Sequence, residues 1–225
     1  MMKRPILLMT GLFVLVPLAM AEPSSEVAFD AETRALLAAA DPQRGEALAG
    51  EAKCRKCHGE AGVSEDPADA NIAGLRASYS FKQLKDYQAE SRDSRDMKKQ
   101  TRKLDDQQMA DLAVWFASLA PAQRDASANV DESVRRLVFH GDPQRMIKAC
   151  SSCHGRDGRG GQYDHPAIAG QNREYFIETM VAFKEGDRSN DVYSRMRLIA
   201  EALTEAEIEG LAAYYAAAVP EAAAE

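Results

Sequence analysis

Two short segments of this 225-residue chain combine cysteine and histidine at the same spacing. Residues 54–58 read CRKCH and residues 150–154 read CSSCH, so all four cysteines fall within a C-x-x-C-H box. Such pairs could form disulfides, bind zinc, act as a redox dithiol or, with the adjacent histidine, attach a c-type haem. The choice depends on the compartment of the protein and on what else in the chain is repeated.

The N-terminal segment indicates export. Two positive charges precede an apolar run over residues 6–19, and residues 19–21 read AMA, a small-residue cleavage pattern. The run contains Gly11 and Pro17 and is shorter than the roughly 20 residues that a transmembrane helix needs. We therefore predict a cleaved signal peptide over residues 1–21 and a periplasmic mature protein.

The charge balance restricts the class of partner. The chain holds 35 acidic and 28 basic residues, with a formal net charge of −7. An acidic protein lacks the positive field that attracts the phosphate backbone, which argues against nucleic acid as a partner. Peripheral docking on a membrane surface stays open.

The two boxes belong to an internal repeat. Cys54 and Cys150 lie 96 residues apart, and at the same offset residues 72–74 and 168–170 both read IAG. After three extra residues in the second copy the offset becomes 99, which aligns Met97 with Met196. We therefore predict a first domain over residues 22–120, a linker over 121–130 and a second domain over 131–225.

Each copy repeats the signals that begin helices. An Asp-Pro pair stands ahead of each box, at Asp41 and Asp142, and capping boxes begin at Asp105 and Thr204. An apolar stripe at i, i+3, i+4, i+7 follows each capping box. Its positions are Met109, Leu112, Ala113 and Phe116 in one copy and Ile208, Leu211, Ala212 and Tyr215 in the other. Nothing alternates at period two, so we predict an all-α fold of two tandem small helical domains. The hydrophobic core of each domain is small, so we expect a large apolar group to fill it.

Covalent haem attachment explains the boxes better than the alternatives do. A disulfide would not require His58 and His154, and zinc would require two pairs 96 residues apart to converge. A thioredoxin-like dithiol needs an α/β pattern that is absent. Cysteines one helical turn apart can reach the two vinyl groups of one porphyrin, and the adjacent histidine can then bind the iron. We predict two haem c groups, attached to Cys54, Cys57, Cys150 and Cys153, with His58 and His154 as iron ligands.

Methionine is the best candidate for the second axial ligand of each iron. His140 and His165 have no counterpart in the first copy, and we interpret them as a surface residue and a loop residue. Met97 and Met196 are aligned by the repeat and lie in segments too charged for a core, SRDMKKQ and SRMRLIA. We predict that they bind the first and second iron, ligation that raises the reduction potential. Three other methionines are interpreted as core residues, Met109, Met146 and Met180.

Together these residues resemble those of the two-domain dihaem class I cytochromes c, most closely the cytochrome c4 family. The resemblance is strongest over CSSCHGRDGRGG, HPAIAGQNREYF and MRLIAEALTEAEIEGLAAYY in the second copy. It implies two class I cytochrome c folds whose haem propionate edges face each other. It also implies a periplasmic carrier between a quinol-oxidising complex and a terminal oxidase or another periplasmic acceptor. Two six-coordinate irons leave no open position for a substrate, so the protein is expected not to be an enzyme.

The first copy departs from the family pattern at the histidine. Ala70 stands where the second copy has Pro166, whose carbonyl commonly holds the ring N–H of the haem histidine in this family. A change beside a metal ligand is expected to tune the metal.

The sequence also allows two alternative functions, and one basic segment has two interpretations. The chain also resembles the electron-accepting haem subunit of flavocytochrome c sulfide dehydrogenase. A dihaem peroxidase would need an open iron and a longer chain. Residues 82–103 contain eight basic and four acidic residues, which indicates either a solvated helix face or a docking patch for an acidic partner.

Overall fold

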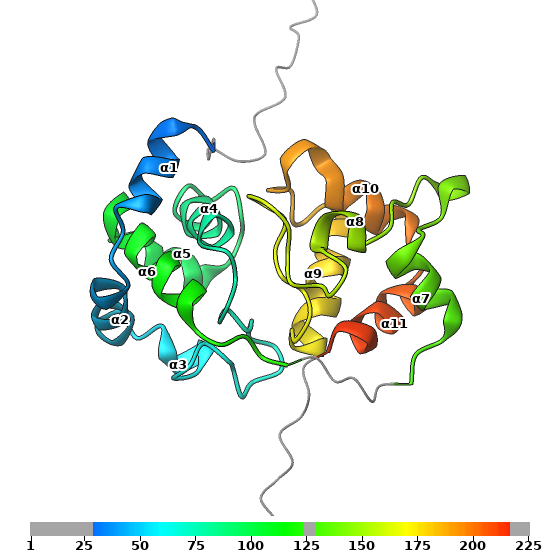
Figure 1. Ribbon diagram of the computed structural model, residues 1–225, viewed down its shortest axis with the longest axis horizontal. Helices are drawn as coiled ribbons and strands as arrows, with labels where there is room; N and C mark the ends of the chain where they lie inside the picture. The colour runs from blue at the N-terminus through cyan, green and yellow to red at the C-terminus, as the bar shows by residue number, and fades with distance from the viewer. Residues whose placement is uncertain (1–28, 124–128, 217–225) are drawn as a thin grey trace, which may run out of the picture.

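A computed structural model describes residues 29–123 and 129–216 of the chain (Figure 1). The predicted signal peptide over 1–21, five linker residues at 124–128 and the C-terminal residues 217–225 lie outside the described residues. Within the described ranges the regular structure is helical, with two isolated β-bridges, Asp142 to Ile147 and Gln171 to Ala216. The all-α prediction is confirmed.

The helices form two groups that lie side by side, one blue to green and one yellow-green to red in Figure 1. The first half contains α1 (Ala31–Ala38), α2 (Pro42–Glu51), α3 (Arg55–His58), α4 (Ala77–Gln88), α5 (Arg95–Thr101) and α6 (Asp106–Ser118). The second half contains α7 (Glu132–Phe139), η1 (Pro143–Arg145), α8 (Ser151–His154), α9 (Arg173–Glu185), η2 (Val192–Ser194), α10 (Arg195–Ala202) and α11 (Glu205–Tyr215). The repeat predicted from the sequence thus reappears as α3 to α6 and α8 to α11. None of the described helices is long and apolar enough to cross a membrane.

The predicted helix starts are largely confirmed. Asp41 accepts a hydrogen bond from the backbone of Gln43 and caps α2, and capping boxes start α6 at Asp105 and α11 at Thr204. The counterpart at Asp142 is different, because it begins only the three-residue 3₁₀ helix η1. The reason is a tight turn in which Asp142 and Ile147 exchange two backbone hydrogen bonds, of 2.8 and 2.9 Å.

That turn also overturns the interpretation of Met146 as a core residue. Met146 adopts a left-handed backbone conformation (φ 57°) and is 87% exposed. Met109 and Met180 are buried, as predicted. The tight turn holds Met146 on the outside of the second half, a placement that the spacing of apolar residues does not encode.

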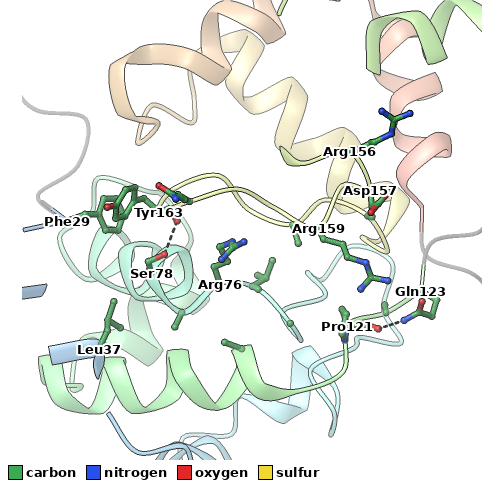
Figure 2. A pocket seen from close by; sticks show the side chains of 18 of the residues that line it. Phe29, Leu37, Arg76, Ser78, Pro121, Gln123, Arg156, Asp157, Arg159 and Tyr163 are labelled. Atoms are coloured by element: carbon green, nitrogen blue, oxygen red, sulfur yellow. Dashed lines mark hydrogen bonds between the residues drawn. The ribbon is translucent and has the colours of Figure 1, made fainter. Parts of the chain in front are cut away.

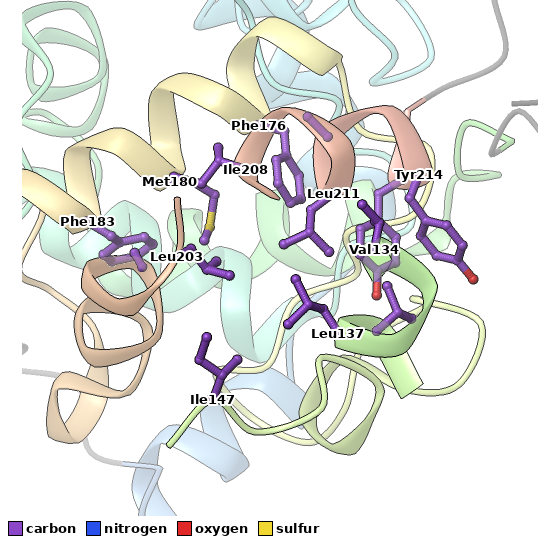
Figure 3. Packing of buried hydrophobic residues seen from close by; sticks show 14 residues of the cluster. Val134, Leu137, Ile147, Phe176, Met180, Phe183, Leu203, Ile208, Leu211 and Tyr214 are labelled. Atoms are coloured by element: carbon purple, nitrogen blue, oxygen red, sulfur yellow. The ribbon is translucent and has the colours of Figure 1, made fainter. Parts of the chain in front are cut away.

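Each half has its own core. In the second half one continuous cluster joins α7, α9 and α11, where Leu137, Met180, Ile208 and Leu211 point toward one another (Figure 3). In the first half the buried residues divide into two smaller clusters, one around Leu112 and Trp115 and the other around Phe81 and Met109. All eight positions of the two predicted apolar stripes are buried.

Candidate functional site

Each C-x-x-C-H box forms a single helical turn. The backbone N–H of His58 donates to the carbonyl of Cys54 at 3.1 Å, and that of His154 donates to Cys150 at 2.9 Å. The cysteines and histidine of each box therefore stand at i, i+3 and i+4, on one face of the turn. No disulfide joins any two of the four cysteines. Among the described residues no three His, Cys, Asp or Glu side chains gather into a metal cluster, so the two boxes do not converge as a shared zinc site would require.

The two histidines are oriented by backbone carbonyls. Nδ1 of His58 lies 2.9 Å from the carbonyl oxygen of Ala70, and Nδ1 of His154 lies 2.8 Å from that of Pro166. A carbonyl can only accept, so each Nδ1 carries the hydrogen and each Nε2 keeps a lone pair for a metal. The first copy has Ala70 where the second has Pro166, and the hydrogen bond to the histidine is kept, because any residue supplies a backbone carbonyl.

The environments of the two histidines differ in burial. His154 is 7% exposed, and loss of solvation lowers the pKa of its imidazole, with a smaller opposing effect from the Pro166 carbonyl. The neutral imidazole that binds iron is thus favoured in the second half. His58 is only partly buried.

Met97 and Met196 occupy matching places in the two halves. Each lies in the first turn of a short helix, Met97 in α5 and Met196 in α10. The N–H of Met97 donates to Ser94 at 3.3 Å, whereas the N–H of Met196 donates to the Asp191 carboxylate at 2.9 Å. Both side chains are partly buried, and that of Met196 packs against the core of the second half. Their role as iron ligands stays a prediction.

The other two histidines lie where the sequence suggested. His140 is exposed at the end of α7. His165 lies in the loop after α8, where its Nε2 accepts a hydrogen bond from Arg195.

A buried polar interface joins the two halves, and the sequence reasoning missed it. Arg92 donates to the hydroxyl of Tyr175 at 2.9 Å, and Arg188 donates to the hydroxyl of Tyr79 at 3.2 Å. The offset of 96 residues relates both arginines and both tyrosines, so the two hydrogen bonds are reciprocal. The side-chain oxygen of Gln83 accepts from both arginines, at 2.8 and 3.2 Å.

The two arginines lack anionic partners. Each is 8% exposed, and within the described residues neither forms an ion pair with a carboxylate. Arg188 also donates to the side-chain oxygen of Asn190 at 3.0 Å, and the two guanidinium groups lie over the rings of Tyr87 and Phe183, at 4.6 and 4.4 Å. Burying a charge without a counter-charge costs free energy, so an anionic group bound at this interface would stabilise the two arginines.

The residues present therefore fit the implied cofactor. A c-type haem brings propionate carboxylates, which would neutralise Arg92 and Arg188. It also needs two thiols and an imidazole on one face of a turn, and each box supplies them. The same positive charges lower the pKa of Tyr175 to about 8, although burial alone would raise it.

Only some of the basic residues in the segment 82–103 are exposed to solvent. Lys82 is buried in an ion pair with Asp86, and Arg92 lies in the interface. Lys85 and Lys98 pair with Asp106 and Glu90. The exposed basic residues without an ion pair in the described structure are Lys99, Arg102 and Lys103, at the end of α5. Of the predicted docking patch, only these three residues are therefore exposed and without an ion pair in the described structure.

Comparison with known proteins identifies the family. The family model for cytochrome c matches residues 42–120. Cytochrome c4 of Thiocapsa roseopersicina is 34% identical over 182 residues, which cover 78% of this chain and 94% of that protein. The chain belongs to the cytochrome c4 family. It is therefore an electron-transfer protein with covalently bound haem c, built from tandem class I cytochrome c domains.

Two further relatives of this cytochrome bear on its role. The crystal structure of reduced recombinant cytochrome c4 from Pseudomonas stutzeri superposes with a TM-score of 0.72 at 29% identity, covering 79% of this chain and 98% of that one. A protein of Stutzerimonas stutzeri (strain A1501) named thiosulfate dehydrogenase electron acceptor is 32% identical over 168 residues. That match covers 72% of this chain and 77% of the relative.

Proposed function

We propose that this cytochrome is a periplasmic dihaem electron carrier, exported by a signal peptide over residues 1–21. The first domain, residues 22–120, and the second, residues 131–225, each hold one haem c and are joined by a linker over 121–130. Haem 1 is attached to Cys54 and Cys57 and its iron is bound by His58 and Met97. Haem 2 is attached to Cys150 and Cys153 and its iron is bound by His154 and Met196.

One observation carries the proposal: both halves build the same one-turn helix with the histidine ring held by a backbone carbonyl. When bound, the haem supplies a one-electron couple at its iron. The chain orients each Nε2 toward the metal through the Nδ1 hydrogen bond. Met97 and Met196 offer a thioether from a matching helical turn, which raises the reduction potential. With a histidine and a methionine of the chain holding each iron, the site would carry electrons and would leave a substrate no place to bind.

The proposed donor is a quinol-oxidising complex, and the proposed acceptor is a terminal oxidase or another periplasmic redox protein. Such partners require brief encounters, which complementary charge accelerates. Lys99, Arg102 and Lys103 offer a small basic surface close in sequence to Met97 for this purpose. Association with the membrane would then be peripheral and would follow from the partner.

The second candidate function is that of an electron-accepting partner in a dehydrogenase complex. The relative named thiosulfate dehydrogenase electron acceptor favours it, and a flavocytochrome c sulfide dehydrogenase is another complex of this kind. Stoichiometric co-purification of a dehydrogenase with the native protein would favour this role. Isolation as a free cytochrome that reduces a terminal oxidase would favour the carrier.

The test is the optical spectrum of the haem-loaded protein in its oxidised and reduced states. We expect the weak long-wavelength band of methionine sulfur on ferric low-spin haem at full intensity for two haems. We also expect no change when carbon monoxide is added to the reduced protein. Half intensity, or a carbon monoxide complex at one iron, would show that one site is open and would contradict the proposal.

A further inference from the structure

A pocket of about 1090 Å³ lies between the two halves and is separate from both boxes. No box cysteine or histidine lines it. Its wall in the first half includes the beginning of α4, and its wall in the second half includes the loop that follows α8 together with Phe139 of α7 and Tyr214 of α11. The pocket therefore exists only because the two halves lie side by side (Figure 2).

The lining of this pocket is positively charged. Arg76, Arg156 and Arg159 are exposed, and none of them forms an ion pair in the part of the chain that the structure describes. Arg34, from α1, adds a fourth positive charge, while Asp157, beside Arg156 in the second half, contributes a carboxylate. The chain as a whole is acidic, with 35 acidic against 28 basic residues. The pocket is therefore positively charged although the chain has a negative net charge, and its four arginines favour an anionic ligand.

The positions of the arginines favour an extended ligand. In Figure 2 Arg76 lies near the middle of the pocket, Arg159 points toward Pro121 and Gln123, and Arg156 stands farther away. Guanidinium groups that are spaced apart in this way can each bind a separate carboxylate through two hydrogen bonds. The volume also lies at the top of the range of about 300–1,000 Å³ that holds small molecules, so a single oxyanion would leave most of the pocket unfilled.

The opposite end of the pocket, where Arg34 also lies, adds apolar side chains. The rings of Phe29 and Tyr163 lie 5.2 Å apart, with Leu37 nearby in Figure 2. The hydroxyl of Ser78 donates to the backbone carbonyl of Tyr163 at 3.0 Å and ties this end to α4. A peptide segment that carries acidic residues and one apolar side chain would match both ends.

We propose that this pocket docks an acidic peptide segment of a protein redox partner, with its carboxylates bound by Arg76, Arg156 and Arg159. The inference rests on the proposed function as an electron carrier. Arg156 and Arg159 follow His154 by two and five residues, so a partner held here stands beside the second box. Because the arginines come from both halves, the segment bridges the two domains.

The experiment measures binding of an octaglutamate peptide to the full-length, haem-loaded protein by isothermal titration calorimetry. In about 0.15 M salt the Debye length is about 8 Å, so charges far from the pocket contribute little. We expect the variant R76Q/R156Q/R159Q to bind the peptide about tenfold more weakly, since three exposed ion pairs are lost. The matched control R135Q/R136Q/R173Q removes three exposed arginines that do not line the pocket. It should change the affinity by about twofold or less.

Two results would overturn the proposal. One is equal affinity of the pocket variant and the control. The other is full displacement of the peptide by inorganic tripolyphosphate at matched charge, which would indicate a small-anion site. The single variants R76E and R159E, one from each half, give a second test should the triple variant fold poorly, and each should weaken binding. Failure of the carrier proposal would show separately in the optical spectrum, because peptide binding does not report on the axial ligands.

Discussion

The loops that hold His58 and His154 make the same hydrogen bond but are supported in different ways. The carbonyl of Ala70 holds His58, and the next residue, Asn71, is docked on the other half of the molecule. Its backbone N–H donates to the side chain of Gln171 at 2.8 Å, its carbonyl accepts from the same side chain at 3.0 Å, and its carboxamide donates to Gly170 at 2.8 Å.

The loop around Pro166 contacts the other half at Tyr163, which accepts from Ser78, and it also has hydrogen bonds within its own half. The backbone N–H of Gly161 donates to His165 at 2.9 Å. The bond from Ile168 to Gly158, at 2.8 Å, recurs in the first half from Ile72 to Gly62 at 2.8 Å. Two copies of one motif therefore differ in what keeps them in place. We expect the first histidine to depend more on the interface, because Asn71, bonded across it, directly follows the carbonyl that holds His58.

The surroundings of the two methionines differ as well. Met97 is followed by the exposed basic residues Lys99, Arg102 and Lys103. Met196 lies between Tyr193 and Leu198, which are 82% and 63% exposed. The two halves therefore present surfaces of different chemistry beside the matched methionines.

The largest expected effect comes from removing each proposed sulfur ligand in turn. Met97→Leu and Met196→Leu should each remove half of the methionine band and allow carbon monoxide to bind one reduced iron. The thioether is lost while a side chain of similar volume is kept. The control is Met146→Leu, which changes an exposed methionine and should leave the spectrum intact. A full-intensity band in either ligand variant would show that the assignment at that site is wrong.

The next effect separates the two histidine loops. Gln171→Ala should leave the buried N–H and carbonyl of Asn71 without partners, at a cost of about 1–3 kcal/mol in the free energy of unfolding. The reduction potential of the first haem should shift more than that of the second, as measured by spectroelectrochemistry. Gln144→Ala, at an exposed position, serves as the control. Equal shifts at both haems would contradict the proposed dependence of the first site on the interface.

A smaller effect concerns the basic end of α5. The variant K99Q/R102Q/K103Q should slow electron transfer to an acidic partner about twofold to tenfold at low salt, because charge complementarity raises the encounter rate. The difference should vanish at high salt, where exposed charges are screened. Stopped-flow kinetics over a salt series measures it. A rate that is unchanged at low salt would remove these three residues as a docking surface.

The smallest effect concerns acid stability and the two capping boxes. Hydrogen bonds from Arg145 lower the pKa of Glu207 at the start of α11 to about 2, and those from Thr204 add to this. A carboxylate whose pKa is lowered by folding stabilises the fold above its ordinary pKa, and this contribution is lost as the pH falls from about 4.5 toward 2.

The first half has the neutral Gln108 at the corresponding position. Glu207→Gln should therefore flatten the acid limb of the unfolding curve, whereas Gln108→Glu should steepen it. Thermal melts between about pH 2 and 5 test both variants, because this range spans the lowered and the ordinary pKa of Glu207. Parallel acid limbs for all variants would show that Glu207 contributes nothing to acid stability.

Local features of this chain could be predicted from the sequence. The two boxes, the capping boxes at Asp105 and Thr204 and the apolar stripes of α6 and α11 depend on residues no more than about two helical turns apart. The repeat then related the boxes and the methionines, and the resemblance over the second copy indicated the family.

Tertiary structure alone decided the features that join residues about a hundred positions apart. It buries Lys82 and Arg92, which the sequence places in a basic run, and it pairs Arg92 with Tyr175 and Arg188 with Tyr79. It also turns Met146 outward and gathers Arg76, Arg156 and Arg159 around one pocket. The spacing of residues along a helix determines which face a side chain occupies. What that face meets is decided only when the two halves pack together.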